Sequence, residues 1–487
     1  NTFNIFYYQS FDRFKYSTLS DYEYSNRGGS VSWARNISPA LTSKLTGTTS
    51  FYNFANTDQS EISRAYTHEY MLNHNELLSE FEWIPSLKHR IDFGASLIYY
   101  RLDRGNVEPY GDASIRNEVD LGFEHAMEGG IFVSDNYAIN DWLTLYAGVR
   151  YSLYSYLGPQ TVMLYEDGKP MSENTIVDSL IFDDFESIKF HSGPEFRFAL
   201  NMKAGPNTSF KLSFNQMRQY LFMLSNTVTI SPTDQWKLSD YHIEPQTGYQ
   251  LTGGVYHIFP KLGLSSSVEL YYKYSTDIVE YKDGADFITS PLTETVVLQG
   301  LQNAYGVEFM LQKTTGRLDG WISYTYSRSE MLVQGDEDYE SINNGNPYPS
   351  NFDRPNVLNV VANYSINRRF SVGSNVVYMS GRPITYPTSL YYINNIAYID
   401  YYARNQFRIP DYFRIDLSFN IEGNLKADKF MHSTWSFNVY NLLGRNNPQS
   451  IYFVPEEYFI KGYSFSVIGV PIFTISWNVK LGNYESH

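Results

Sequence analysis

The chain is dominated by segments in which apolar and polar residues alternate one by one. The clearest examples are residues 143–151, 413–422 and 473–481. Side chains alternate between the two faces of a β-strand, so each of these segments has one apolar and one polar face. The pattern therefore predicts long strands, each placed between an apolar and a polar environment.

About 18 such segments can be counted, and short and long connections alternate between them. They begin near residues 1, 23, 40, 61, 88, 115, 141, 187, 207, 244, 262, 293, 317, 353, 369, 405, 433 and 465. The long polar connections lie near 104–114, 158–186, 219–243, 334–352, 382–404 and 446–464. An outer-membrane barrel has short periplasmic turns and long extracellular loops. A soluble sandwich has no reason to gather its long loops at one end. The rhythm predicts an all-β fold, a transmembrane antiparallel β-barrel, as one domain over residues 1–487.

A membrane barrel also fixes the direction of each face. Lipid offers no hydrogen-bond partners, so strands can cross it only in a closed sheet. We expect the apolar residues to face lipid: Leu145, Val149, Phe413, Leu417, Phe473, Ile475 and Trp477. Their polar neighbours, including Arg150, Arg414, Asp416 and Glu422, are expected in the lumen. An even number of strands puts both ends of the chain on the periplasmic side.

Composition narrows the class of protein further. No uncharged apolar run reaches the 18 residues that a membrane-spanning helix needs. The 37 Lys and Arg against 52 Asp and Glu give a net charge of −15, which argues against a nucleic-acid partner. With no cysteine, there is no disulfide framework and no thiol nucleophile. The chain has neither an N-terminal Met nor a signal peptide, so we expect a mature or truncated form.

Candidate chemistry is sparse. His68 and His74 share a strand face but lie roughly 20 Å apart, too far to bind one metal ion. The acidic runs 183–186 and 336–338 fall in long connections, where solvated surface is favoured over calcium ligation. No metalloprotease, serine-hydrolase or phosphate-loop spacing occurs. We predict that the protein is not an enzyme and has no cofactor or metal site.

Several local sequences carry a resemblance to a known family. They include "DYHIEPQTGYQLTGGVYH" (240–257), "VELYYKYSTDIVEYKDGA" (268–285), "NFDRPNVLNVVANY" (351–364), "MSGRPITYP" (379–387) and "NVYNLLGRNNPQSIYF" (438–453). As a set they resemble TonB-dependent outer-membrane receptors of Bacteroidetes, continuously over about the last 270 residues. The resemblance implies a 22-stranded barrel that an N-terminal plug fills and the TonB complex energises. Against that pattern, we expect the plug, the TonB box and the first four strands to be absent from this chain.

The resemblance also singles out residues. The motif positions are interpreted as barrel and loop architecture: Asp353, Arg354, Gly381, Arg382, Pro383, Asn438, Asn441, Arg445 and Asn446. Asp353 and Arg354 are expected to pin a loop to the wall through a charge-assisted pair. Aromatic and amide residues in the long connections are the candidates for substrate contact, since they suit stacking and hydrogen bonding. These are Trp236, Tyr241, Tyr391, Tyr392, Asn394 and Asn395.

The leading hypothesis is active uptake of a large nutrient across the outer membrane of a Gram-negative bacterium. The substrate stays open among a glycan, a peptide, a siderophore and cobalamin. The partners implied are outer-membrane lipid and the TonB complex, which acts through the plug. Two alternatives stay open: a barrel subunit of a larger complex with a surface lipoprotein, SusD-like or other, and a porin-like channel.

Overall fold

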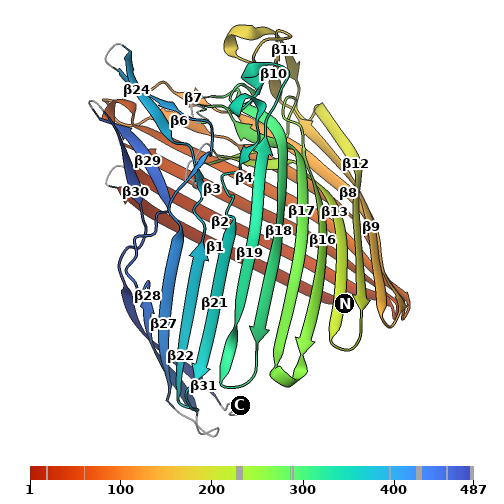
Figure 1. The fold of residues 1–487 in the computed structure, drawn as a ribbon. Coiled ribbons are helices and arrows are strands. Elements are labelled where there is room, and N and C mark those ends of the chain that lie inside the picture. The colour runs from red at the N-terminus through yellow and green to blue at the C-terminus, as the bar shows by residue number, and fades with distance from the viewer. Residues whose placement is uncertain are drawn as a thin grey trace.

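One large antiparallel sheet curves around a central lumen in the computed structural model (Figure 1). The structure describes residues 1–17, 20–59, 61–225, 234–283, 285, 287, 290–393, 396–423, 430–456 and 459–482. The sheet has 21 strands, of which three are short ones at its rim: β6 (Asn106–Pro109), β7 (Val119–Asp120) and β20 (Tyr348–Pro349). The other strands form the wall, in which each strand pairs with its neighbours in chain order.

The wall strands are β1 (Thr2–Ser17), β2 (Ser20–Ser38), β3 (Leu41–Asp58), β4 (Tyr66–Ser86), β5 (His89–Asp103), β8 (Phe123–Asn140), β9 (Leu143–Leu157), β12 (Ser187–Lys203), β13 (Thr208–Gln219), β16 (Gln246–Phe259), β17 (Leu264–Tyr281), β18 (Val297–Lys313), β19 (Leu318–Leu332), β21 (Asn356–Ser365), β22 (Phe370–Met379), β27 (Tyr412–Glu422), β28 (Met431–Tyr440) and β31 (Ile472–Leu481). The predicted strands therefore all exist, and the predicted fold class is confirmed. No helix in the described part of the chain is long and apolar enough to cross a membrane.

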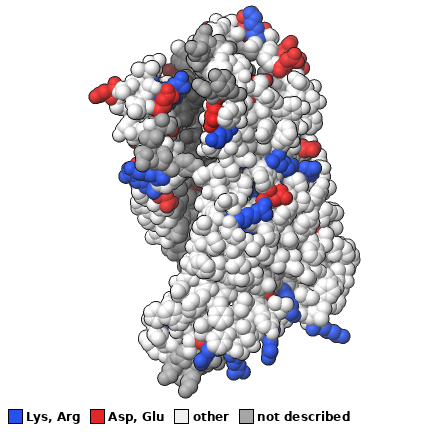
Figure 2. Space-filling view, turned by 60° about the vertical axis from the view of Figure 1, so that its left-hand side comes forward, with Lys and Arg blue, Asp and Glu red and all other residues white. Residues whose placement is uncertain are grey.

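The outer face of the wall is apolar, as the alternation predicts. Phe473, Ile475, Trp477, Leu417 and Val149 are all exposed to the outside of the sheet. Phe413 and Leu145, on the same faces, are half-buried. Figure 2 shows one side of the molecule, white over most of its area, with residues of both charges in its upper part and Lys and Arg along its lower end. Exposing so large an apolar surface to water would be unfavourable, whereas contact with lipid is favourable for it.

The two ends of the barrel differ sharply. At one end the wall strands are joined by tight turns, such as Ser86 to His89 and Lys313 to Leu318. At the other end the long connections carry, within the described residues, five small hairpins and five short 3-10 helices (Figure 1). The hairpin strands are β10 (Gln160–Tyr165), β11 (Ile176–Phe182), β14 (Leu221–Leu224), β15 (Gln235–Leu238), β23 (Pro383–Ile384), β24 (Pro387–Ile393), β25 (Ile396–Tyr401), β26 (Phe407–Arg408), β29 (Ser450–Pro455) and β30 (Ile460–Phe465). The 3-10 helices are η1 (Ile62–Arg64), η2 (Glu173–Thr175), η3 (Pro260–Leu262), η4 (Thr293–Thr295), η5 (Asp338–Glu340) and η6 (Asn343–Gly345), and η3 alone lies at the end of tight turns. The expected alternation of short and long connections is present.

The sheet has two free edges. Within the described residues, β1 pairs with β2 alone and β31 pairs with β28 alone. Each edge thus presents a row of backbone N–H and C=O groups without a ladder partner. Lipid cannot satisfy such groups, so in a membrane both edges need a pairing partner.

Candidate functional site

The connection between β13 and β16 folds into the barrel instead of standing above it. The Tyr70 hydroxyl on β4 donates to the Asp234 carbonyl oxygen at 3.0 Å, and the Tyr154 hydroxyl on β9 donates to the Ser239 carbonyl oxygen at 2.6 Å. Tyr154 alternates with the outward-facing Leu153, so it points into the lumen. The hairpin of β14 and β15 therefore lies against the inner wall formed by strands that are distant in the sheet.

A buried group of charges fastens this hairpin. Lys237 donates to the carboxylates of Glu124 at 2.9 Å and Asp240 at 2.5 Å, and its side chain is 3% exposed. The second oxygen of Glu124 accepts the backbone N–H of Leu238 at 3.0 Å. Burial acts to lower the pKa of Lys237, but the neighbouring carboxylates of Asp240 and Glu124 prevail and raise it. The lysine is therefore a fixed cation that joins the hairpin to β8.

The carboxylate of Asp240 is tied to the same place. Burial acts to raise its pKa, but the Lys237 ammonium and the backbone N–H groups of Ile243 and His242 together lower it below the ordinary value. Both N–H groups donate to one carboxylate oxygen, at 2.8 and 2.9 Å. Charges are buried at low cost only when paired and hydrogen-bonded in this way.

Arg104 is positioned by the turn that follows β5. Gly105 has a φ of +78°, and a Cβ there would collide with the carbonyl oxygen of Glu69, so only glycine fits. This turn directs the Arg104 guanidinium toward Glu124, 3.8 Å away, and its Nη1 donates to the Pro291 carbonyl oxygen at 3.0 Å. Arg104 and Lys237 thus share one carboxylate.

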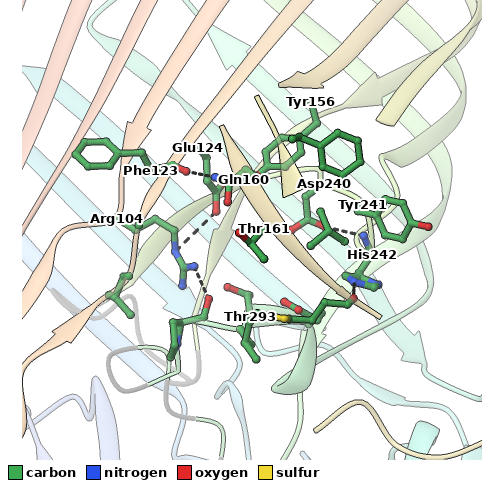
Figure 3. A pocket seen from close by; sticks show the side chains of 18 of the residues that line it. Arg104, Phe123, Glu124, Tyr156, Gln160, Thr161, Asp240, Tyr241, His242 and Thr293 are labelled. Carbon is green, nitrogen blue, oxygen red and sulfur yellow. Dashed lines mark hydrogen bonds and ion pairs between the residues drawn. The ribbon is translucent and has the colours of Figure 1, made fainter. Parts of the chain in front are cut away.

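A cavity of about 530 Å³ opens beside this charge group (Figure 3). Four long connections supply its walls, through residues 104, 120–124, 156, 159–163, 181–182, 237, 240–242 and 291–294. Four carboxylates line it, from Asp120, Glu124, Asp240 and Glu294, against the two cations of Arg104 and Lys237. The cavity lies at the loop end of the barrel, where a solute from outside would arrive.

Some of the polar groups around the cavity are hydrogen-bonded and others have no partner among the described residues. The His242 Nε2 lies 2.9 Å from the Met163 carbonyl oxygen, and Glu294 accepts the Tyr165 hydroxyl at 2.8 Å. Burial is the main reason that the pKa of Tyr165 is raised, and the Glu294 charge raises it further. The Thr293 hydroxyl is buried and has no hydrogen-bond partner in the described part of the chain. Within the same residues, no group of three His, Asp or Glu could hold a metal ion.

The structure separates the residues suggested for substrate contact. Tyr241 lines the cavity, next to His242. Trp236 does not line it, but packs against aromatic residues of the inner wall, among them Tyr70. Tyr391 and Tyr392 lie on β24, away from the cavity, and are about half exposed. Asn394 and Asn395 lie outside the described residues.

The motif residues hold the connections onto the wall. Buried Asp353 pairs with Arg408 and accepts the Ser329 N–H at 2.7 Å, while Arg354 donates to the Met379 sulfur at 2.9 Å. The expected charge pair therefore exists, but Asp353 forms it with Arg408 on β26 and with Arg328 on β19, 3.5 Å away, instead of with the adjacent Arg354.

The other motif residues make similar contacts. The N–H of Gly381 donates to Asp411 at 2.9 Å, Arg382 donates to the Gln449 carbonyl oxygen at 2.5 Å, and Pro383 pairs with Arg408. Asn438 donates to Thr474, Asn441 to the Arg445 carbonyl oxygen, and Arg445 to the Asp411 carbonyl oxygen. Asn446 lies against Gly469. None of these motif residues lines the cavity.

Sequence reasoning missed the charged residues of the cavity. Arg104, Glu124, Lys237 and Asp240 come from three separate connections or strand ends, and no local spacing links them. One signal was available, since Lys237 and Asp240 stand in a segment with Trp236, Leu238 and Ile243. Charges among apolar residues indicate a buried pair when a partner is at hand.

Together, the apolar outer face of the sheet and the long connections at one end define a β-barrel protein of the outer membrane, with a cavity at the end that carries these connections. The family model described as "TonB dependent receptor-like, beta-barrel" matches residues 1–442, so the chain belongs to that family. This places it in the outer membrane of a Gram-negative bacterium. No curated protein matches the chain.

Solved structures with the same fold include receptors and a transporter. The ferric-catecholate import receptor Fiu from E. coli K12 is 12% identical, with a TM-score of 0.59 over 95% of this chain and 65% of that receptor. The ferric yersiniabactin uptake receptor FyuA from Yersinia pestis is 13% identical, with a TM-score of 0.60 over 95% and 62%. The copper transporter OprC is 12% identical, with a TM-score of 0.58 over 98% and 73%. The chain thus spans less than two thirds of Fiu and of FyuA, and the likeness concerns the fold alone.

Proposed function

We propose that residues 1–487 form the barrel domain of a TonB-dependent receptor that takes up a large solute across the outer membrane. The family membership supports this proposal, and the cavity at the outer end is the observation that carries it. A simple porin needs no built cavity in its entry path, whereas a receptor must hold its solute before transport. In the whole protein, a plug would fill the lumen and respond to the TonB complex.

The resemblance to receptors of Bacteroidetes belongs to this proposal. So does the solute, because the structural neighbours named for ferric siderophores and copper share only 12–13% identity with this chain. Inward-facing polar side chains, such as Asn375 hydrogen-bonded to Asp416 at 3.2 Å, would meet the plug.

The test is growth of the native host on single limiting nutrients. The gene is deleted in one strain and the TonB gene in another, and both are compared with the complemented strain. We expect one nutrient on which both deletions fail and complementation restores growth. Planar-bilayer recording of the full-length protein can contradict the proposal. A large, steady conductance that no solute changes would favour a porin-like channel over a receptor.

A second candidate, a barrel subunit that works with a surface lipoprotein, is favoured by the outer hairpins. The exposed rings of Tyr392 on β24 and Tyr452 on β29 stand above the wall, and the two hairpins are linked by the Tyr392 hydroxyl, 3.3 Å from the Glu456 carbonyl oxygen. Exposed aromatic surface outside the membrane is typical of protein contacts. Affinity purification of the native protein tests it: recovery of one lipoprotein in equal amount supports this role, and recovery of the receptor alone contradicts it.

A further inference from the structure

The cavity has a surplus of negative charge that its own cations cannot neutralise. Arg104 and Lys237 are both engaged with Glu124, and Lys237 also with Asp240. These four side chains balance one another. Asp120 and Glu294 also line the cavity, and neither forms an ion pair with any residue that the structure describes.

The two carboxylates are held in place but keep hydrogen-bonding capacity. Asp120 accepts the Gly122 N–H at 2.8 Å through one oxygen, and Glu294 accepts the Tyr165 hydroxyl through one oxygen. Their second oxygens accept no hydrogen bond from the described residues. Each carboxylate is thus oriented by the fold and can accept further donors.

An independent observation indicates that a ligand belongs here. Thr293, which precedes Glu294, is 1% exposed, and its hydroxyl lacks a partner within the described residues. The Nε of Arg104, also buried, makes no hydrogen bond there either. Buried polar groups without partners are rare, and a cavity that two of them line is typical of a binding site.

We infer that the cavity binds a ligand carrying ammonium or guanidinium groups, with Asp120 and Glu294 as its ion-pair partners. The ligand's N–H donors match the carboxylate oxygens and the Thr293 hydroxyl, and the cavity is also lined by the Tyr241 ring, whose face attracts cations. An anionic solute would face two surplus negative charges with every cation of the cavity already paired. The inference rests on the proposed function, since it names the class of solute that the receptor selects.

Isothermal titration of the full-length protein in detergent tests the inference, with spermidine as the cationic probe and citrate as the anionic probe. We expect saturable binding of spermidine that weakens as salt is raised, and no binding of citrate. The double variant Asp120→Asn, Glu294→Gln keeps the shapes and the two internal hydrogen bonds. It should weaken spermidine binding by about a hundredfold, about tenfold for each charge removed.

Asp112→Asn is the matched control, because this exposed carboxylate lies in the same β5–β8 connection but does not line the cavity. It should bind spermidine as the parent does. Absence of spermidine binding, binding of citrate, or an equal loss in the control would each overturn the inference. The measurement uses no TonB complex, so spermidine binding without energised uptake would contradict only the proposed function.

Discussion

Lys237 is the residue on which the inward hairpin depends most. Its ammonium is nearly fully buried and faces two carboxylates, which are themselves buried. Removing one member of such a group leaves an uncompensated charge on a side chain that is almost fully buried. The residue therefore fixes the position of a whole connection.

Substitution Lys237→Met should release the hairpin from β8. The loss should be about 3–5 kcal/mol, because Asp240 would remain buried without a cation and Glu124 would keep only Arg104, 3.8 Å away. Hydrogen exchange of the amides of 235–243 in the full-length protein would measure the local opening. Lys169→Met is the control, since Lys169 forms an exposed pair with Glu166 at 2.8 Å and should change little. Unchanged protection in Lys237→Met would show that the charges do not hold the hairpin.

The attachment should also depend on pH in one direction. The folded pKa of Asp240 lies below its ordinary value of 3.8, so its contribution is present above that value and lost as pH falls through the folded pKa. The hairpin should stay attached from neutral pH to 3.8 and detach only in stronger acid. The fluorescence of Trp236 reports on the attachment, and the variant Trp236→Phe identifies its share of the signal. A transition above pH 5 would contradict the assignment of Asp240 as the titrating group.

At the scale of elements, the alternation of side chains decides which way each strand faces. Leu417, in the middle of β27, is exposed on the outer face, whereas the next residue, Ser418, which pairs with Asn438 on β28, points to the opposite face. The two positions are adjacent in the sequence, but one side chain faces lipid and the other faces the lumen. A charged side chain therefore has opposite consequences at adjacent positions.

Leu417→Arg should destabilise the barrel in lipid by about 2–4 kcal/mol, because the guanidinium would lie near the middle of the bilayer. Ser418→Arg should have a mild effect, since its side chain enters the polar lumen. Urea unfolding of the full-length protein from lipid vesicles measures both. Equal effects of the two substitutions would mean that the faces are assigned wrongly.

The same alternation explains how much of the fold can be predicted from sequence. The strand expected near residue 187 begins there, because a polar connection meets a regular alternating segment. The strands expected near 405 and 465 begin at Tyr412 and Ile472, since Pro410 and Pro471 interrupt the ladder and the preceding residues join small hairpins. Alternation indicates a strand but not which partner it pairs with.

The cavity could not be predicted in this way. The sequence indicates Tyr241, an aromatic residue in a long connection, and this residue lines the cavity, but no local pattern indicates its charged neighbours. A local pattern gives the faces of a strand, whereas the direction in which a connection folds depends on distant partners. Glu124 and Lys237 are 113 positions apart and meet only in the folded barrel.

At the scale of the whole molecule, the two ends of the barrel differ. One end carries long connections that contact one another, and the other end carries short turns. The long connections interlock through bonds such as that of the Arg404 Nη1 with the Tyr281 carbonyl oxygen at 2.8 Å, which joins the β22–β27 connection to β17. Such cross-links make the outer end a continuous layer.

The free edge at β1 has a consequence for handling the protein. Residues 2–11, "TFNIFYYQSF", contain neither charge, proline nor glycine, and β1 offers them along an unpaired row of backbone groups. Segments of this kind recruit a second copy of themselves by adding strand to strand. A preparation limited to these 487 residues should therefore self-associate in detergent, with a mass by light scattering of two chains or more. Replacing Phe6 with Pro should reduce that assembly, because proline removes a backbone donor at the seam where the copies would join.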